Sequence, residues 1–205
     1  MQGGTNMSQR DNIKNGKLFT DMGEGLPEER LRGKELVYDF NHTRPSEQEK
    51  RAALAKELFG SYGAHCWIEP PLHLCYGAHT FIGDGFYANT NLTIMDDTTV
   101  TIGNGVLLGP NVTICTVGHP IDPDLRATGQ MYAFPVVIED GVWIGSGAII
   151  NPGVTIGRNS VIGAGSVVTK DVPPGVIAVG NPCRVLREIN EEDKIYYYKD
   201  RKVES

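Results

Sequence analysis

Apolar residues recur at every sixth position along the second half of the chain. The repeated positions are Ile138, Ile144, Ile150, Ile156, Ile162 and Val168. Four residues after each comes a small or β-branched residue, namely Val142, Ala148, Val154, Ser160, Ser166 and Val172. An α-helix repeats about every 3.6 residues and an exposed strand every second residue, so neither fits. The period indicates short flat strands joined by corners, three of which close one triangular coil of a parallel β-helix.

The same register continues upstream at Ile102, Leu108 and Ile114. A further block keeps the spacing of six but is shifted by two residues, at Ile82, Ala88 and Ile94. Glycine directly follows several repeated residues, where a missing Cβ permits a tight corner, as at Gly145, Gly157 and Gly163. A sandwich of short strands would instead place a turn about every 8–12 residues. We therefore predict a fold dominated by β structure, with the β-helix over residues 61–182.

Helical composition flanks the repeat. Three segments precede it, Gln9–Leu18, Glu28–Phe40 and Ser46–Phe59, and Ser46 with Glu49 forms a predicted capping box. An apolar stripe in the third segment is expected to pack on the first coils, with Ala52, Ala53, Leu54, Ala55, Leu58 and Phe59. The predicted organisation is a flexible leader at 1–7, a helical segment at 8–60, the β-helix, and a tail at 183–205. In that tail, Arg184–Lys199 is interpreted as a short C-terminal helix.

The six-residue register is lost between Ile114 and Ile138. These two residues are 24 positions apart, so one retained hexapeptide leaves 18 residues that project as a loop, at about 117–135. A long loop in a regular scaffold is typical of a functional segment. It contains His119, the only histidine after residue 79. Histidine is the natural general base near neutral pH, and its place in this loop favours a catalytic role over a surface turn.

Composition narrows the classes of function. The chain has 19 Lys plus Arg against 25 Asp plus Glu and a net charge of −6, which argues against nucleic-acid or anionic-membrane partners. Its four cysteines form no Cys-x-x-Cys pair, as expected of reduced cytoplasmic thiols. The sequence shows neither a secretory leader nor an apolar run of about 20 residues. Glycine motifs of triphosphate or dinucleotide sites are absent as well.

Several segments resemble the galactoside O-acetyltransferases, a branch of the hexapeptide acyltransferases that also includes the maltose O-acetyltransferases. The similarity runs from about Asn15 to Ser205 and is carried by 16–27, 38–42, 68–71, 86–89, 118–120, 142–146, 151–157 and 168–173. Phe19–Asp21 is the stretch that points to sugars. The resemblance implies a left-handed β-helix, acetyl-CoA as donor, and direct transfer to the 6-hydroxyl of a hexopyranoside. It also implies a homotrimer with active sites between neighbouring coils, and an exposed Trp143 would agree with such contacts.

The resemblance also implies roles for individual residues. His119 is the general base, and backbone N–H groups near Ser146 stabilise the oxyanion. Acceptor hydroxyls are held by Asp21, Asn89 and Asp97, with Arg30, Tyr87 and Met131 nearby. Cys75 stands where the galactoside enzymes carry a serine, which replaces a hydroxyl by a weakly bonding thiol. The acetyl-CoA positions are Ser146, Ala164, Thr169, Lys170, Arg184 and Arg187, of which the last two lie near the nucleotide phosphates.

Other interpretations stay open from the sequence. The acceptor is alternatively maltose, glucose or a xenobiotic, and a non-catalytic hexapeptide subunit would explain the repeat alone. A hexapeptide carbonic anhydrase would need about three zinc ligands, but His65, His73 and His79 are expected to line coil surfaces, so we expect no metal. Cys75 and Cys115 lack a partner base for nucleophilic catalysis. A structural role would also explain each of the acceptor residues. Asn89 could stack in an asparagine ladder, Asp21 could cap a helix, and Asp97 could stabilise a corner of the coil.

Overall fold

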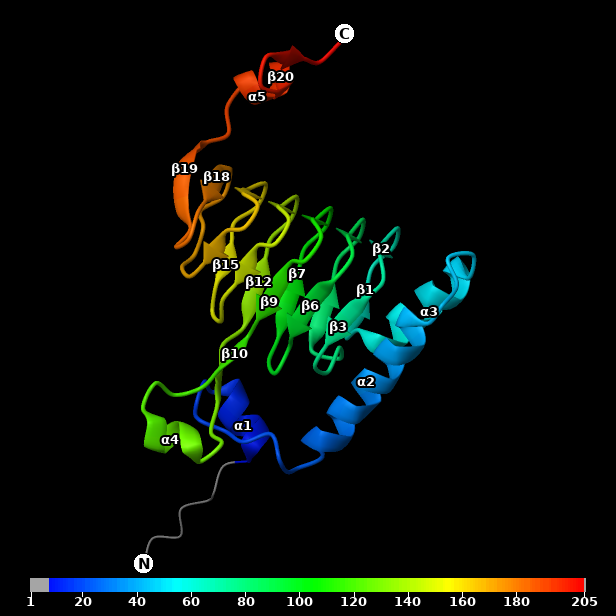
Figure 1. Ribbon diagram of the computed structural model, residues 1–205, viewed down its shortest axis with the longest axis vertical. Coiled ribbons are helices and arrows are strands. Elements are labelled where there is room, and N and C mark those ends of the chain that lie inside the picture. The colour runs from blue at the N-terminus through cyan, green and yellow to red at the C-terminus, as the bar shows by residue number, and fades with distance from the viewer. Residues whose placement is uncertain (1–7, 205) are drawn as a thin grey trace, which may run out of the picture.

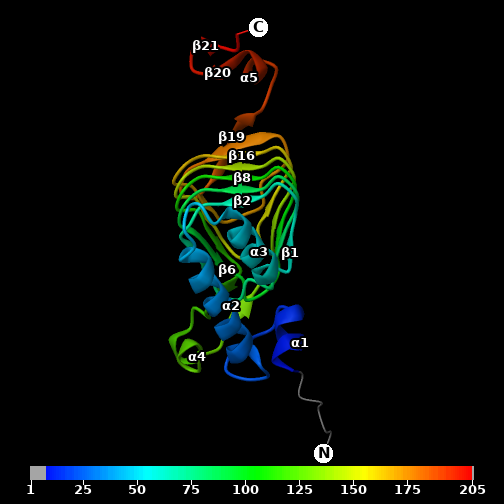
Figure 2. The ribbon, with the colours of Figure 1, turned by 90° about the vertical axis from the view of Figure 1, so that its right-hand side faces the viewer.

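A computed structural model describes residues 8–204, so the predicted leader at 1–7 lies outside the described residues. Most of the described chain winds into a parallel β-helix whose coils stack along one axis (Figure 1). Viewed along the stack, the coils have a triangular outline with one sheet on each side (Figure 2). This architecture confirms the prediction made from the six-residue period.

Three sheets form the sides of the triangle. Sheet 1 contains β1 (Ser61–Tyr62), β4 (Thr80–Ile82), β7 (Val100–Ile102), β12 (Val136–Ile138) and β15 (Thr155–Ile156). Sheet 2 contains β2 (Trp67–Ile68), β5 (Tyr87–Ala88), β8 (Leu107–Leu108), β13 (Trp143–Ile144), β16 (Val161–Ile162), β18 (Val176–Val179) and β19 (Arg184–Glu188). Sheet 3 contains β3 (Leu72–Leu74), β6 (Leu92–Met95), β9 (Thr113–Cys115), β14 (Ile149–Ile150) and β17 (Val167–Val168).

The repeated apolar residues form the core. All six repeat positions between Ile138 and Val168 are fully buried, and the accompanying small or β-branched residues from Val142 to Val172 are buried as well. Each two-residue strand from β13 to β17 thus directs one apolar side chain inward. Equivalent positions stack in register from coil to coil, as Ile138 does on Ile156. Burying an aliphatic side chain of this size contributes about 1.5–3 kcal/mol, so the column of such residues holds the coils together.

The two-residue shift in the sequence pattern has a structural cause. Tyr62 pairs with Ile82 and Ile82 with Ile102, so these coils have 20 residues. Ile138 pairs with Ile156, so the later coils have 18. The two extra residues of each early coil lie where sheet 3 passes into sheet 1, between Leu74 and Ile82 and again between Ile94 and Ile102. The early coils therefore have a wider corner on this side.

Helices pack on the first coil and on the wide corners. They are α1 (Gln9–Lys14), α2 (Leu26–Asn41) and α3 (Gln48–Leu58). Phe40 and Leu58 join the buried core of the β-helix. The predicted first helix ends at Lys14 instead of Leu18, because the chain turns at Gly16, whose φ is +62°.

The capping box predicted for the third helix was wrong. α3 begins at Gln48, beyond Ser46, and the Glu47 carboxylate accepts a hydrogen bond from the Arg44 N–H at 2.7 Å. The predicted stripe is also narrower, because Ala52 and Ala53 are exposed, whereas Ala55, Leu58 and Phe59 are buried. Arg51 is buried in their place and donates from Nε to Thr43 Oγ1 at 2.8 Å.

The loop projects below the stack of coils (Figure 1). Strands β10 (Val117–Gly118) and β11 (Tyr132–Ala133) pair antiparallel at its base, and α4 (Pro123–Ala127) lies between them. Asp122 caps α4 by accepting the Leu125 N–H at 2.8 Å. A β-bridge between Phe19 and Met131 ties the loop to the segment after α1.

The predicted C-terminal helix is much shorter than expected. Residues 184–188 form β19, which pairs antiparallel with β18, because β18 offers backbone groups that the next coil would otherwise bond. Helix α5 spans only Glu192–Ile195, and the tyrosine run forms β20 (Tyr196–Tyr198), which pairs with β21 (Arg201–Lys202). Aromatic residues favour such extended pairing. Within residues 8–204, no helix is long and apolar enough to cross a membrane.

Candidate functional site

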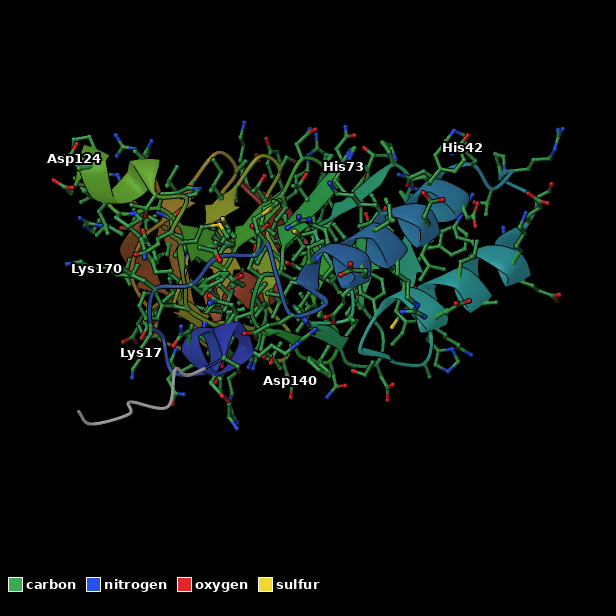
Figure 3. The ribbon with its side chains drawn as sticks, turned by 90° about the horizontal axis from the view of Figure 1, so that it is seen from below. Lys17, His42, His73, Asp124, Asp140 and Lys170 are labelled. Carbon is green, nitrogen blue, oxygen red and sulfur yellow. The ribbon has the colours of Figure 1, made fainter. Side chains whose placement is uncertain are left out.

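Two edges of the triangular coil carry the residues singled out by the sequence. The loop edge lies between sheets 3 and 1 and comprises residues 75–79, 96–99, 116–135, 151–153 and 169–171. The amide edge lies between sheets 2 and 3 and comprises residues 69–71, 89–91, 109–111, 145–147 and 163–165. The loop edge is the apex near α1, α2 and α4, opposite sheet 2 (Figure 2). Figure 3 looks onto this edge from below.

The predicted site residues divide between these edges. The loop edge holds Cys75, Asp97, His119, Thr169 and Lys170, and the amide edge holds Asn89, Ser146 and Ala164. Asn111 begins the crossing of sheet 3 on the amide edge and Val117 ends it on the loop edge. These six residue-to-residue steps span roughly 20 Å. One chain therefore does not bring its own His119 next to its own Ser146.

His119 is exposed at the base of the loop, directly after β10. Its Nδ1 lies 3.1 Å from the carbonyl oxygen of Gln130, on the opposite arm of the loop. Because a carbonyl only accepts hydrogen bonds, Nδ1 carries the proton in this contact. In the neutral ring, Nε2 is then left as an unprotonated acceptor, which is the form that a general base requires.

Asp21 forms an ion pair with Arg30 of α2, whose charge acts on Cys75 and Asp97 of the loop edge. Both side chains are partly buried, and the N-cap of α2 is Gly25, so Asp21 does not cap this helix. Nearby Cys75 is buried, and its burial together with the charges of Asp97 and Asp96 raises the pKa of the thiol to about 12. Cys75 is therefore a neutral thiol near pH 7, which agrees with the sequence-based view that it is no nucleophile.

Asp97 is the most unusual side chain of the loop edge. It is 5% exposed, and its Oδ2 is the only buried side-chain polar atom without a hydrogen-bond partner among residues 8–204. Burial, reinforced by the neighbouring charge of Asp96, raises the pKa of Asp97. An unbonded buried carboxylate oxygen is costly to the fold, so it is a strong candidate for a ligand contact.

Asp96, rather than Asp97, stabilises the wide corner. Its Oδ1 accepts the Tyr76 N–H at 2.8 Å, and its Oδ2 accepts the Thr80 hydroxyl at 3.0 Å. Sequence reasoning missed Asp96 and Glu29 and expected His79 only to line a coil surface, whereas all three join one network. The two-residue shift in the repeat was the only sequence signal for this corner.

The amide edge presents an unused backbone donor. Gly145 and Gly147 donate their N–H groups to Ile162 and Pro110 at 2.8 and 2.9 Å, but within the described chain the N–H of Ser146 has no acceptor. Gly109 lies directly beneath, where an added Cβ would come within 2.7 Å of the Ser146 nitrogen. Asn89 sits outside the asparagine ladder of this edge, because the ladder hydrogen bond joins Asn91 to Asn111 at 3.1 Å.

Of the three basic residues predicted to contact acetyl-CoA, namely Lys170, Arg184 and Arg187, only two are available to an anionic ligand. Lys170 and Arg184 are exposed and line one small cleft of about 130 Å³ at the C-terminal end of the coils. Lys170 projects at the end of the molecule where α4 lies (Figure 3). Arg187 instead donates two hydrogen bonds to Asp193, at 2.6 and 2.7 Å, and this contact lowers the pKa of Asp193 to about 2.

The histidines suggested as metal ligands do not converge. His73 lies on β3, His79 on the loop edge, and His65 at the third edge, between sheets 1 and 2. Among residues 8–204, no group of three His, Cys, Asp or Glu side chains is arranged to hold a metal ion.

Comparison with known proteins agrees with this architecture. The maltose acetyltransferase hexapeptide capping motif matches residues 13–63, and the bacterial transferase hexapeptide of six repeats matches residues 135–170. The galactoside O-acetyltransferase of Escherichia coli K12 is 62% identical over 98% of this chain and 98% of its own length. That of Lactococcus lactis is 44% identical, with coverage of 92% and 91%.

Solved structures give the same result. A galactoside acetyltransferase in complex with coenzyme A superposes with a TM-score of 0.96 at 62% identity, covering 98% of this chain and all of the other. A maltose O-acetyltransferase from Clostridium difficile 630 has a TM-score of 0.88 at 46% identity, with coverage of 90% and 99%. The fold and the hexapeptide repeat define an acyltransferase of the hexapeptide-repeat class. Within that class, the chain belongs to the galactoside and maltose O-acetyltransferase family.

Proposed function

We propose that this protein transfers the acetyl group of acetyl-CoA to the 6-hydroxyl of a galactoside or a related sugar, with both substrates bound together. The observation that carries the proposal is His119, whose Nδ1 is fixed by the Gln130 carbonyl at 3.1 Å so that Nε2 is free to act as a base. Relatives named for coenzyme A and galactoside chemistry, at 62% identity, support the choice of substrates.

The chain's own groups account for each step. His119 Nε2 removes the proton from the acceptor hydroxyl, whose oxygen attacks the thioester carbon. The unused N–H of Ser146 donates to the carbonyl oxygen as negative charge develops there. When the carbon–sulfur bond breaks, the His119 imidazolium returns its proton to the departing sulfur. No acetyl-enzyme is required.

The acceptor contacts lie on both edges. Asp21 and Asp97 offer carboxylate oxygens to sugar hydroxyls on the loop edge, and Asn89 offers an amide from the amide edge. Cys75 contributes a buried neutral thiol, which bonds a hydroxyl weakly. We assign the donor to Ser146, Ala164, Thr169, Lys170, Arg184 and Arg187, where two exposed cations suit its phosphates.

This division supports a homotrimer in which the loop edge of one copy faces the amide edge of the next. Acetyl transfer needs the base and the oxyanion donor within hydrogen-bond distance of one reacting group, but a single chain holds them on opposite sides of sheet 3. Sheet 2 also exposes an apolar row, with Trp143 at 54%, Leu107 at 47% and Tyr87 at 36%, paired in register. Such a row is typical of an interface between copies. We place the trimer in the cytoplasm.

The decisive experiment measures CoA thiol release from acetyl-CoA with a thiogalactoside, a glucoside, maltose, chloramphenicol, and no acceptor. Release that depends on the thiogalactoside supports the proposal. Stronger release with maltose or the glucoside favours the maltose branch, to which the 46% identical maltose O-acetyltransferase belongs. If no sugar causes thiol release although CoA still binds, the sugar acceptor would be removed from the proposal.

A further inference from the structure

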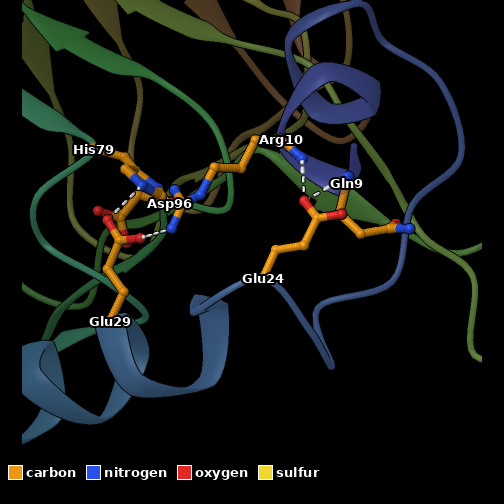
Figure 4. Close-up of polar contacts among 6 residues, drawn as sticks. All are labelled: Gln9, Arg10, Glu24, Glu29, His79 and Asp96. Atoms are coloured by element: carbon orange, nitrogen blue, oxygen red, sulfur yellow. Dashed lines mark hydrogen bonds and ion pairs between the residues drawn. The ribbon is translucent and has the colours of Figure 1, made fainter. Parts of the chain in front are cut away.

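His79 connects the helices to the wide corner of the loop edge. Its Nδ1 lies 2.7 Å from the Asp96 carbonyl oxygen, and its Nε2 lies 3.2 Å from Glu29 Oε1 on α2 (Figure 4). The other oxygen of Glu29 accepts from Arg10 of α1 at 2.7 Å. The ring also stacks on Tyr76, with the ring centroids 4.8 Å apart.

Both ring nitrogens of His79 face hydrogen-bond acceptors. The Asp96 carbonyl oxygen only accepts, so Nδ1 must carry a proton. Burial alone would raise the pKa of Glu29, but the hydrogen bond from Arg10 and the charge of His79 lower it below the usual value. Glu29 is therefore an ionised acceptor, and Nε2 needs a proton as well. The contacts fit a doubly protonated imidazolium.

Asp96, which His79 contacts, directly precedes Asp97, the residue whose carboxylate we assign to the acceptor. Asp96 receives three hydrogen bonds from residues 76–80, from the Tyr76 N–H, the Thr80 hydroxyl and His79. Asp97 follows directly, and it lines a cavity of about 370 Å³ together with His79, Arg10 and Lys14. The positive charge of His79 opposes the burial and the Asp96 charge that raise the pKa of Asp97.

We propose that His79, as an imidazolium bridging Asp96 and Glu29, is a positioning residue that fixes the wide corner and so places Asp97 for the acceptor. This inference rests on the proposed function, because it assigns Asp97 to the acceptor. Loss of the His79 proton turns its contact with Glu29 into two facing acceptors, which loosens α2 from the corner. The charged groups around His79 are Arg10 and Lys14 of α1, Glu29 and Arg30 of α2, and Asp96 and Asp97 of the corner.

The first test compares His79→Gln with a matched control, His65→Gln, which alters an exposed histidine on another edge. Glutamine keeps one donor but loses the charge. We expect the KM for the acceptor to rise about tenfold at pH 7, with the KM for acetyl-CoA within twofold of wild type. A parallel increase of both KM values with a lower Tm, or no change in either, would overturn the proposal.

A second test needs no activity. Nitrogen NMR of protein labelled at histidine, with His79→Gln used to assign the signals, reports directly on each ring nitrogen. We expect both nitrogens of His79 to be protonated near pH 7, and loss of the Nε2 proton in Glu29→Gln. An unprotonated Nε2 in the wild type contradicts the inference. If wild type acetylates no sugar while both nitrogens are protonated, the positioning of an acceptor fails together with the proposed function, but the bridged imidazolium stands.

Discussion

At the scale of single residues, His119 is the group whose loss should be felt most in the chemistry and least in the fold. Its ring is exposed, and its one described contact is the Gln130 carbonyl. We expect His119→Ala to lower kcat by about 100-fold or more, while Tm and CoA binding stay at wild-type values. Steady-state kinetics and calorimetric titration with CoA measure both. His65→Ala, on a different edge, serves as the control, and unchanged turnover in His119→Ala would exclude the general-base role.

Asp97, which we assign to acceptor binding, is expected to lower the stability of the fold. Its pKa is raised in the folded chain, so the fold binds this proton more tightly than the unfolded chain does. The fold therefore gains stability as the pH falls through the pKa that Asp97 has in the folded chain, and the gain is complete below the pKa that it has in the unfolded chain. At pH 7 the ionised Asp97 destabilises the protein. We expect Asp97→Asn to stabilise the fold by about 1–3 kcal/mol and to raise Tm by a few degrees, while weakening acceptor binding.

Thermal unfolding between pH 4 and 8 provides the check, because the difference in Tm between wild type and Asp97→Asn should shrink towards low pH as Asp97 becomes protonated. Asp39→Asn, at an exposed position of α2, is the matched control and should change neither Tm nor the acceptor KM. A lower Tm for Asp97→Asn at pH 7 would mean that its carboxylate has a stabilising partner.

At the scale of elements, the loop edge depends on how closely α2 approaches the wide corner. Gly33 is buried in α2, and a Cβ there would overlap the carbonyl oxygen of Tyr76. Alanine normally favours a helix over glycine by about 1 kcal/mol. A backbone carbonyl cannot move aside as a flexible side chain can. We therefore expect the overlap to cost about 1–3 kcal/mol and to outweigh the helix preference of alanine.

Gly33→Ala should therefore lower Tm. It should also raise the KM for the acceptor, because Tyr76 adjoins Cys75, which we assign to the acceptor pocket. Thermal unfolding and steady-state kinetics measure these effects. Gly23→Ala is the control, because an added Cβ at Gly23 meets no atom within 4 Å. A higher Tm for Gly33→Ala would show that α2 shifts readily on the corner.

The elements also show where sequence reasoning succeeds and where it stops. A six-residue period fixes the coils because each strand must bury one apolar residue, so Ile138 and its repeats were placed correctly. The tail was misassigned because its state depends on pairing with β18, a partner that local pattern does not contain. The loop that holds His119 was predicted because it interrupts a regular scaffold, and the role of His119 stays a prediction. Asp96 was missed, and His79 was expected only to line a coil surface, because their contacts arise only when α2 meets the wide corner.

At the scale of the whole molecule, the proposed division of the site between two edges gives a complementation test. His119→Ala damages the loop edge and Asn89→Ala the amide edge, so each pure protein should be nearly inactive. If the sites form between copies, trimers reassembled from an equal mixture should recover about a quarter of wild-type activity, because that fraction of interfaces joins two intact edges. Activity after denaturation and refolding of the mixture measures this, with separately refolded proteins as controls. Absence of recovery would indicate a site within one chain.

The reversed strand β19 has a consequence beyond this one chain. Each coil presents to the next coil the same pattern of backbone donors and acceptors that it bonds on its other side. The repeat itself therefore sets no limit on the number of coils. β19 runs against β18 and ends that succession on sheet 2, while α2 and α3 occupy the opposite end. The length of the particle is thus decided by its ends and not by its repeat. Without them, the same coils would be a template for fibres.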